Sequence, residues 1–168
     1  VLLLRPEIEA LRLTTDLAAD VQCLRLLSEE PLVMLAGTDP ADVFRVTGDG
    51  SAQRLEGFDR VRGREAWSTP WGGPAAVRSL ADGGGCLYAD IHVGSIARSG
   101  DGGETWEPVD AVIHPDVHQV ATCPAAPDRL YANTADAVWV SADRGGSWRH
   151  CASGIAARYG RALAVHPT

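Results

Sequence analysis

A pattern of eight residues, S-x-D-x-G-x-[ST]-W, occurs twice in this chain, at residues 99–106 and 141–148. The two copies begin 42 residues apart, a spacing typical of proteins in which each repeat forms one supersecondary unit that stacks on its neighbours. This repeat limits the choice of fold more than any other feature of the sequence. It predicts a chain built from successive copies of one small structural unit.

The residue types in the pattern predict a tight hairpin turn, and we call residues 99–106 and 141–148 the two clasps. Glycine permits positive φ, and a short carboxylate can accept hydrogen bonds from backbone N–H groups of the same turn. A calcium loop would need several alternating oxygen ligands, whereas each clasp has one central Asp. We therefore expect a structural role for Ser99, Asp101, Gly103, Thr105, Trp106, Ser141, Asp143, Gly145, Ser147 and Trp148.

The clasps resemble Asp-boxes, also called BNR repeats, which in known families lie in the turn between the third and fourth strands of a β-propeller blade. The resemblance implies a propeller like those of sialidases, sortilin-type receptors and xyloglucanases. It does not imply one activity, because fold does not fix function.

Strand-like segments recur in the same order before and after each clasp, which predicts an all-β fold with blades of four antiparallel strands. About three full blades cover residues 20–58, 76–113 and 117–153, and partial blades cover residues 1–17 and 160–168. Residues 8–17 could instead form a short helix. We predict a single β-propeller domain over residues 1–168. Propellers of this kind usually have more blades, so we expect a fragment of a longer propeller rather than a four-blade ring.

The charge and cysteine content narrow the range of partners. Acidic residues outnumber basic ones, 22 to 15, so we expect no nucleic acid, which needs clustered Lys or Arg. The apolar run at residues 1–4 is too short to cross a bilayer, and we expect a soluble protein with no membrane contact. The four cysteines contain no C-x-x-C pair and read as reduced thiols. They favour the cytoplasm, although the compartment stays open.

If the clasps lie at one end of the blades, the loops that join second to third strands and the loops that enter each blade lie at the other end. Loops on a rigid scaffold carry function more often than the scaffold does, so we expect the binding face there. Its candidate ligand-binding residues are Trp67, Trp71, Asp90, His92, His114, Asp116, His118, Arg158 and Tyr159.

The segment His-Pro-Asp-Val-His at residues 114–118 is the densest group of functional side chains. Residues two apart in an extended segment share a side, so His114, Asp116 and His118 could converge opposite His92 or Asp90. Such a set could bind a metal ion. Hydrogen bonds that fix the junction between two blades explain the same residues more simply, and we predict no metal and no cofactor.

Two further groups have a binding and a structural interpretation. Trp67 and Trp71 could form a platform for a sugar ring, but we favour two hydrophobic plugs that seal a loop onto the sheet. Arg158 and Tyr159 could hold a carboxylate, or could belong to a solvated loop. A sialidase needs three arginines from separate blades, and this pair is the one Arg/Tyr cluster expected at the rim. We therefore assign no catalytic residue.

These observations leave two functional hypotheses. The first, which we favour, is a non-catalytic propeller whose channel face binds a glycan, a small molecule or a partner protein. The second is a glycoside-hydrolase-like enzyme of the sialidase superfamily, a glycosidase with two rim carboxylates about 5 to 10 Å apart. A buried, pKa-shifted pair of carboxylates in a wide cleft would favour the enzyme.

Overall fold

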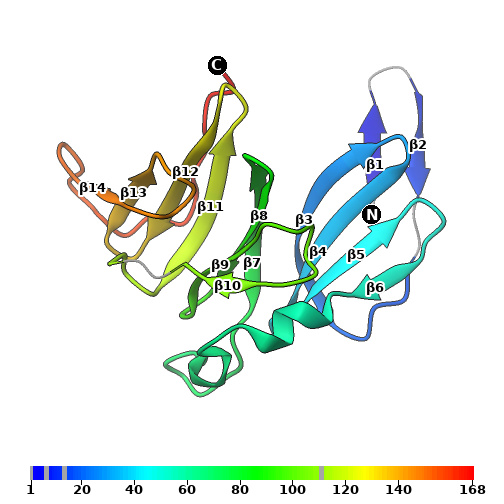
Figure 1. Cartoon of the computed structure of the whole chain (residues 1–168), viewed down its shortest axis with the longest axis horizontal. Coiled ribbons are helices and arrows are strands. Elements are labelled where there is room, and N and C mark those ends of the chain that lie inside the picture. Colours follow the sequence, from blue (N-terminus) through cyan, green and yellow to red (C-terminus); the bar gives the residue numbers. More distant parts are fainter. Residues whose placement is uncertain (1, 6–7, 13–14, 110–111) are drawn as a thin grey trace.

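The computed structural model describes residues 2–5, 8–12, 15–109 and 112–168. Three four-stranded antiparallel sheets follow one another along the chain (Figure 1), each built from consecutive strands. The first sheet contains β3 (Asp20–Glu29), β4 (Leu32–Asp39), β5 (Val43–Thr47) and β6 (Ala52–Arg54). The second contains β7 (Val77–Gly83), β8 (Cys86–Ile91), β9 (Ser95–Ser99) and β10 (Glu107–Pro108). The third contains β11 (Val117–Cys123), β12 (Ala126–Thr134), β13 (Ala137–Ser141) and β14 (Arg149–Cys151).

The sheets lie side by side like the blades of a propeller, with β7 in contact with both β3 and β11. The first strands of the three sheets therefore lie next to one another. The predicted all-β fold with four-stranded antiparallel blades is confirmed. Within the described part of the chain, the helices are two short 3-10 turns, η1 (Glu56–Arg60) and η2 (Arg64–Ala66), and no helix has the length and apolarity needed to span a bilayer.

The two ends of the chain differ from the three sheets. β1 (Leu2–Arg5) and β2 (Ile8–Arg12) form a separate hairpin, so the helix considered for residues 8–17 is not found at residues 8–12. Residues 160–168, expected to be a first strand, form no strand. They lie along β11, where the Leu163 N–H donates to Gln119 Oε1 (2.7 Å) and the Cys123 thiol donates to the His166 carbonyl (3.4 Å). A strand requires a regular backbone ladder with a neighbour, and these contacts involve side chains.

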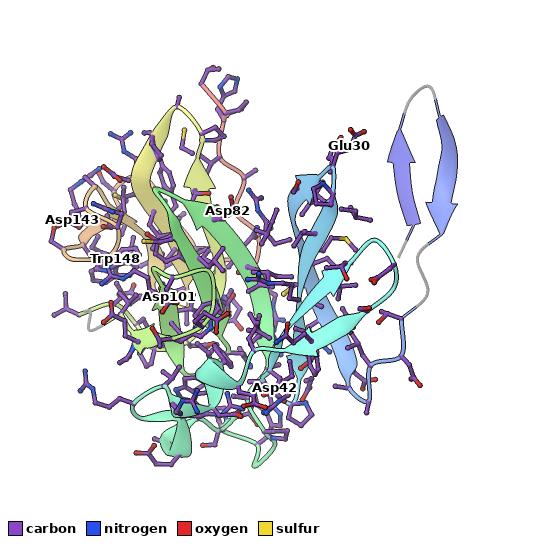
Figure 2. The ribbon with its side chains drawn as sticks, turned by 45° about the vertical axis from the view of Figure 1, so that its right-hand side comes forward. Glu30, Asp42, Asp82, Asp101, Asp143 and Trp148 are labelled. Carbon is purple, nitrogen blue, oxygen red and sulfur yellow. The ribbon has the colours of Figure 1, made fainter. Side chains whose placement is uncertain are left out.

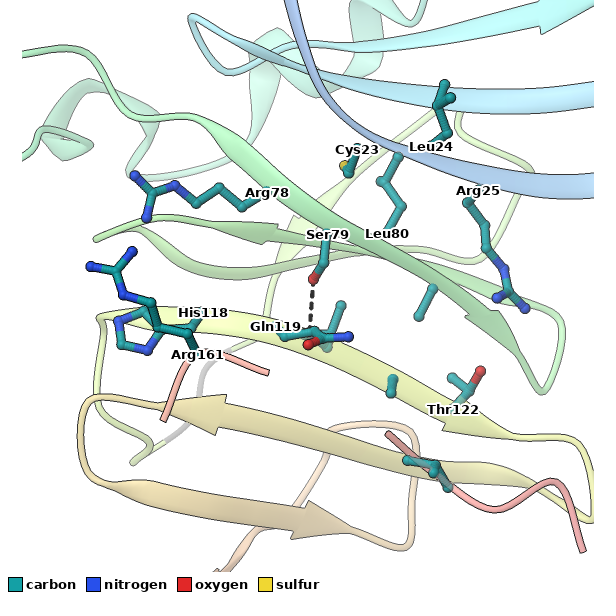
Figure 3. A pocket seen from close by; sticks show the side chains of 14 residues that line it. Cys23, Leu24, Arg25, Arg78, Ser79, Leu80, His118, Gln119, Thr122 and Arg161 are labelled. Atoms are coloured by element: carbon teal, nitrogen blue, oxygen red, sulfur yellow. Dashed lines mark hydrogen bonds between the residues drawn. The ribbon is translucent and has the colours of Figure 1, made fainter. Parts of the chain in front are cut away.

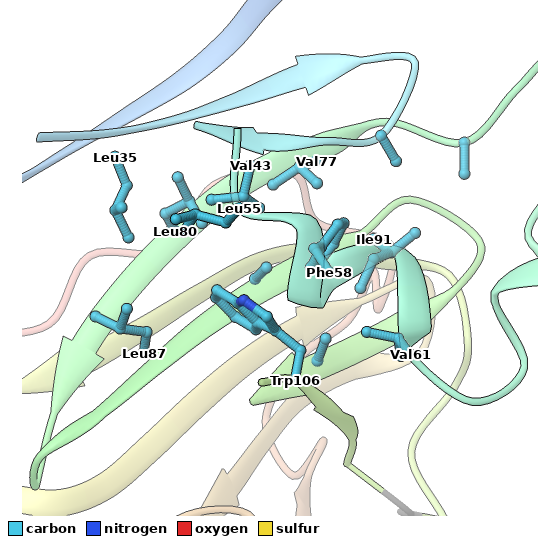
Figure 4. Close-up of a cluster of buried hydrophobic side chains, with 14 residues drawn as sticks. Leu35, Val43, Leu55, Phe58, Val61, Val77, Leu80, Leu87, Ile91 and Trp106 are labelled. Carbon is cyan, nitrogen blue, oxygen red and sulfur yellow. The ribbon is translucent and has the colours of Figure 1, made fainter. Parts of the chain in front are cut away.

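The hydrophobic core fills the spaces between adjacent sheets. Between the first and second sheets, Phe58 of η1 meets Trp106 edge-on, with ring centroids 5.3 Å apart (Figure 4). Between the second and third sheets, Trp148 packs against a cluster that includes Val117 and Leu130. Each clasp thus supplies the tryptophan that seals its own sheet to the preceding one.

The two clasps have the same hydrogen bonds. In the first, the Ser99 hydroxyl donates to Asp101 (2.8 Å), and both the N–H (2.9 Å) and the hydroxyl (2.6 Å) of Thr105 donate to the same carboxylate. Asp143 accepts the equivalent three bonds, from Ser141 and Ser147, at 2.7 to 2.8 Å. These bonds lower the pKa of both aspartates to about 2. The carboxylates are therefore ionised and fully engaged in holding the turns.

The clasps lie at the opposite end of the sheets from the turns that carry the candidate residues. Ser99, which precedes the first clasp, pairs with Leu87 at the start of β8, whereas the β8–β9 turn follows Ile91 at its far end. Figure 2 labels Glu30 and Asp82 toward one end of the sheets and Asp42 toward the other.

Candidate functional site

The end of the sheets opposite the clasps brings His92, Asp116 and His118 together. His92 Nε2 lies 3.4 Å and His118 Nε2 lies 3.2 Å from the same oxygen, Asp116 Oδ1. His92 directly follows β8, and Asp116 lies in the loop that enters the third sheet. The Ser95 N–H donates to the Pro115 carbonyl (3.0 Å) and ties the β8–β9 turn to that loop. Two segments that are distant in sequence therefore meet at one carboxylate.

Both histidine side chains are almost completely buried. Burial lowers the pKa of His92, and the positive charge of Arg78 adds to the effect. His118 Nδ1 lies 2.6 Å from the Gly160 carbonyl oxygen. A carbonyl oxygen can only accept, so this nitrogen carries the proton.

His118 reaches this position because β11 has an irregular register there. Val117 pairs with Thr134 and Gln119 with Asn133, so His118 is an extra residue in the ladder. A β-bulge of this kind changes the direction of a side chain. In the first strands of the other two sheets, the register shifts at the same place, at Gln22 in β3 and at Arg78 in β7.

The three bulges direct side chains from successive sheets toward one cleft. Gln22, Arg78 and His118 line it together with Arg161 from the C-terminal segment, and its volume is about 300 Å³. It adjoins a larger pocket of about 550 Å³ between β3, β7 and β11, where Figure 3 shows Arg78, His118 and Arg161 at the same end. We call the two together the channel groove. No described residue forms an ion pair or hydrogen bond with the Arg78 guanidinium.

Gln22 and Arg78 were not among the candidate residues predicted from the sequence. An alignment of the repeated units could have identified them. Residues 20–25, 76–81, 116–121 and 159–164 align as the starts of successive units. The third position of this alignment holds Gln22, Arg78, His118 and Arg161. Because these residue types differ, a search for motifs of one type does not find them.

Asp90 lies beside this site but is inaccessible. Its side chain is fully buried, and its Oδ2 accepts a hydrogen bond from the Ser79 hydroxyl (2.9 Å). Burial raises the pKa of Asp90 to about 8, so the carboxyl group is mostly protonated at neutral pH.

The two tryptophans of the entering loop have different roles. Trp67 packs against Phe58 with centroids 5.6 Å apart, and the Arg64 guanidinium covers its ring. Trp71 is 69% exposed and lies 5.4 Å from the His92 ring. The plug interpretation therefore fits Trp67 and is wrong for Trp71, whose face is open to solvent beside the histidines.

The remaining candidates divide in the same way. Tyr159, 55% exposed, meets His118 edge-on at 4.7 Å. Arg158 turns away and forms an ion pair with Asp136 (3.4 Å). His114 is exposed and does not join the cluster, since its Nδ1 accepts a hydrogen bond from the Asp116 N–H (3.1 Å).

Comparisons with known proteins place the chain by its fold. No family model matches the sequence, and no curated protein matches it significantly. Solved structures do match. An ancestral GH74 enzyme is 15% identical with a TM-score of 0.59, and the match covers 84% of this chain and 20% of that one. The GH74 enzyme of Niastella koreensis is 17% identical with a TM-score of 0.55 (77% of this chain, 22% of that one), and the GH74 xyloglucanase of Xanthomonas campestris is 18% identical with a TM-score of 0.52 (79% of this chain, 23% of that one). This chain spans about a fifth of the length of these enzymes. At such low identity the likeness concerns the fold alone, and the chain has the propeller-blade architecture of the GH74 enzymes.

Proposed function

We propose that this chain belongs to a longer Asp-box propeller, and that its channel groove binds an anionic ligand without catalysing a reaction. The observation that carries the proposal is the convergence of Gln22, Arg78, His118 and Arg161 from equivalent positions of successive units. The bulges in β3 and β7 direct Gln22 and Arg78 to this space, and Arg161 joins them from the C-terminal segment, so three side chains can donate hydrogen bonds to one ligand.

The donors favour a carboxylate-bearing ligand. Guanidinium groups bind planar carboxylates through two parallel hydrogen bonds, and the Arg78 guanidinium has no hydrogen bond or ion pair with a described acidic residue. The exposed aromatic faces of Trp71 and Tyr159, on either side of the two histidines, suit the apolar face of a sugar ring. The proposed ligand class is therefore a small acidic saccharide.

The surroundings of the nearby carboxylates support a non-catalytic role. Glycoside hydrolysis needs two carboxyl groups that reach the substrate. Asp90 is completely buried, and Asp42 is paired with both Arg54 (2.7 Å) and Arg64 (3.0 Å). Asp136 is similarly engaged with Arg158.

A second candidate function is supported by one observation. Burial raises the pKa of Asp90, and the nearby Asp116 carboxyl group adds to the shift; a neutral acid beside a second carboxyl group is an arrangement that glycosidases use. Together with the GH74-like fold, this keeps a glycoside hydrolase as the alternative. Catalysis would require a movement that exposes Asp90.

Calorimetric titration of the chain with glucuronate and with glucose tests the proposal. We expect binding of glucuronate only, and at least a tenfold loss of affinity in Arg78→Met and Arg161→Met, since a charge-assisted bond contributes about 1.5 to 3 kcal/mol. Arg149→Met, an exposed arginine on β14, is the matched control and should bind normally. Equal binding of glucose, or unchanged affinity in both groove variants, would reject the proposal. Hydrolysis of aryl glycosides by the chain would favour the enzyme.

A further inference from the structure

We propose that His92, Asp116 and His118 form a binding site for one divalent transition-metal ion, with Zn²⁺ the first candidate. This site goes beyond the proposed ligand-binding function and does not depend on it. Two imidazoles and one carboxylate are a common ligand set for zinc, and three protein ligands leave a fourth position for water or another ligand.

The distances between the donor atoms fit a small ion. One donor atom from each of the three residues can be chosen so that all lie within 4.8 Å of one another. The two histidine nitrogens lie 3.2 and 3.4 Å from Asp116 Oδ1. In a tetrahedral zinc site with bonds of about 2.1 Å, neighbouring donor atoms are about 3.4 Å apart. Both contacts to Asp116 therefore already have the required length.

The contact between His118 and Asp116 has no hydrogen bond to explain it. His118 Nδ1 carries its proton toward the Gly160 carbonyl, so Nε2 is the ring nitrogen left to bind a metal ion, and it faces a carboxylate oxygen 3.2 Å away. Both atoms are buried, and neither has a hydrogen-bond partner among the described residues. A metal ion bound by both atoms would satisfy them together.

The surroundings of the cluster resemble the support that metal ligands receive from neighbouring groups. A metal-bound histidine usually donates its other ring N–H to a carbonyl or carboxylate, which fixes the orientation of the ring; the Gly160 carbonyl does this for His118. The Asp116 backbone is held by its N–H bond to His114 Nδ1 (3.1 Å). Ring contacts with Trp71 and Tyr159 restrict the two histidines further.

The ligand types and nearby charges select the kind of ion. Ca²⁺ and Mg²⁺ prefer several oxygen ligands, and here two of three donors are imidazoles. Arg78 and Arg161 are close enough to act electrostatically on His92. Their positive charges repel a cation, so an ion bound only by electrostatic attraction is disfavoured. Zn²⁺ and Co²⁺, which bind imidazole strongly, suit the site better.

Metal uptake by the purified chain tests the site. The chain is stripped with EDTA, dialysed and titrated with Zn²⁺ by calorimetry and with Co²⁺ by visible absorption. We expect one ion per chain, a tetrahedral Co²⁺ spectrum, and at least a hundredfold weaker binding in Asp116→Asn and His118→Gln, because losing a ligand costs more than the 10- to 100-fold typical of outer-shell changes. His166→Gln, which removes an exposed histidine outside the cluster, should bind normally.

Three measurements keep the outcome clear. Circular dichroism and melting without metal show whether each variant is folded, and zinc-soaked crystals of the unaltered chain should give an anomalous peak between the three side chains, whatever the variants do. A folded, unaltered chain that takes up no Zn²⁺, or Asp116→Asn with unchanged uptake, would overturn the inference. So would nitrogen NMR signals showing both His118 nitrogens protonated in the presence of Zn²⁺. Arg78→Met should lose glucuronate but retain Zn²⁺, which separates failure of this site from failure of the proposed function.

Discussion

The backbone N–H of Val120 in β11 donates a 2.8 Å hydrogen bond to the Ser79 hydroxyl in β7. That hydroxyl in turn donates to the buried Asp90 carboxyl (2.9 Å). One side chain thus satisfies a backbone group of the third sheet and an acid of the second. The first strands of neighbouring sheets are joined here by a polar contact as well as by apolar packing.

Removing this hydroxyl should weaken the junction between the two sheets. Ser79→Ala leaves the Val120 N–H without its partner, and we expect a loss of about 1 to 3 kcal/mol in the free energy of unfolding. Urea denaturation measures the change, with the exposed Ser153→Ala as control. A loss below about 0.5 kcal/mol, the range of ordinary surface substitutions, would contradict this role.

Trp106 and Trp71 should differ sharply when replaced by alanine. Trp106 is 6% exposed in the core between the first two sheets, so Trp106→Ala should cost about 3 to 5 kcal/mol of stability. The exposed Trp71 should change stability by less than about 0.5 kcal/mol and instead weaken glucuronate binding. Melting curves and titrations of both variants, measured side by side, check the two expectations. Similar melting temperatures for the two variants would refute the assignment.

The clasp aspartates predict how stability changes in acid. Their pKa of about 2 in the folded chain lies below the usual value of about 3.9 in an unfolded chain. The stabilisation is therefore complete above pH 4 and is lost as the pH falls toward 2. Asp101→Asn should be less stable than the unaltered chain at pH 7, and the difference should shrink between pH 4 and 2. Denaturation midpoints over this range test the prediction, with the exposed Asp16→Asn as control; a constant difference would count against it.

Gly57 should tolerate no side chain. A Cβ atom at this position would lie 2.0 Å from the Glu104 carbonyl oxygen of the first clasp, so η1 and the clasp would have to separate. We expect Gly57→Ala to cost about 1 to 3 kcal/mol, the usual effect of overpacking. Gly100→Ala, where a Cβ atom meets open space, is the matched control. Equal stability of the two variants, measured by urea denaturation, would show that the contact is not tight.

Local features of the sequence were enough to predict the four-stranded sheets. Each clasp holds its turn with bonds among residues at most four positions apart, so its structure follows from its own residues. The different roles of Trp67 and Trp71 could not be predicted in this way. Trp67 is partly buried because η1 places Phe58 against it, and that contact depends on how two sheets and a helical turn pack.

The candidate site was likewise predictable from the sequence only in part. His114, Asp116 and His118 lie close in sequence and share an extended segment, which suggested that all three converge. The backbone bends at residues 112, 113 and 115 instead of running extended, and the Asp116 N–H donates back to His114 Nδ1, so His114 stays outside. Arg78 belongs to a strand with no motif, and its importance depends on strand register.

The repeated bulge has a consequence for how such a groove can change. Each of the three sheets contributes one inward side chain from an extra residue that lies outside the regular ladder, so exchanging it need not alter the sheet that carries it. A single substitution at Gln22 or Arg78 therefore changes one of the side chains that line the channel groove and leaves the other units unchanged. The scaffold and its selectivity are thereby separable, which makes these positions natural targets for engineering new binding preferences.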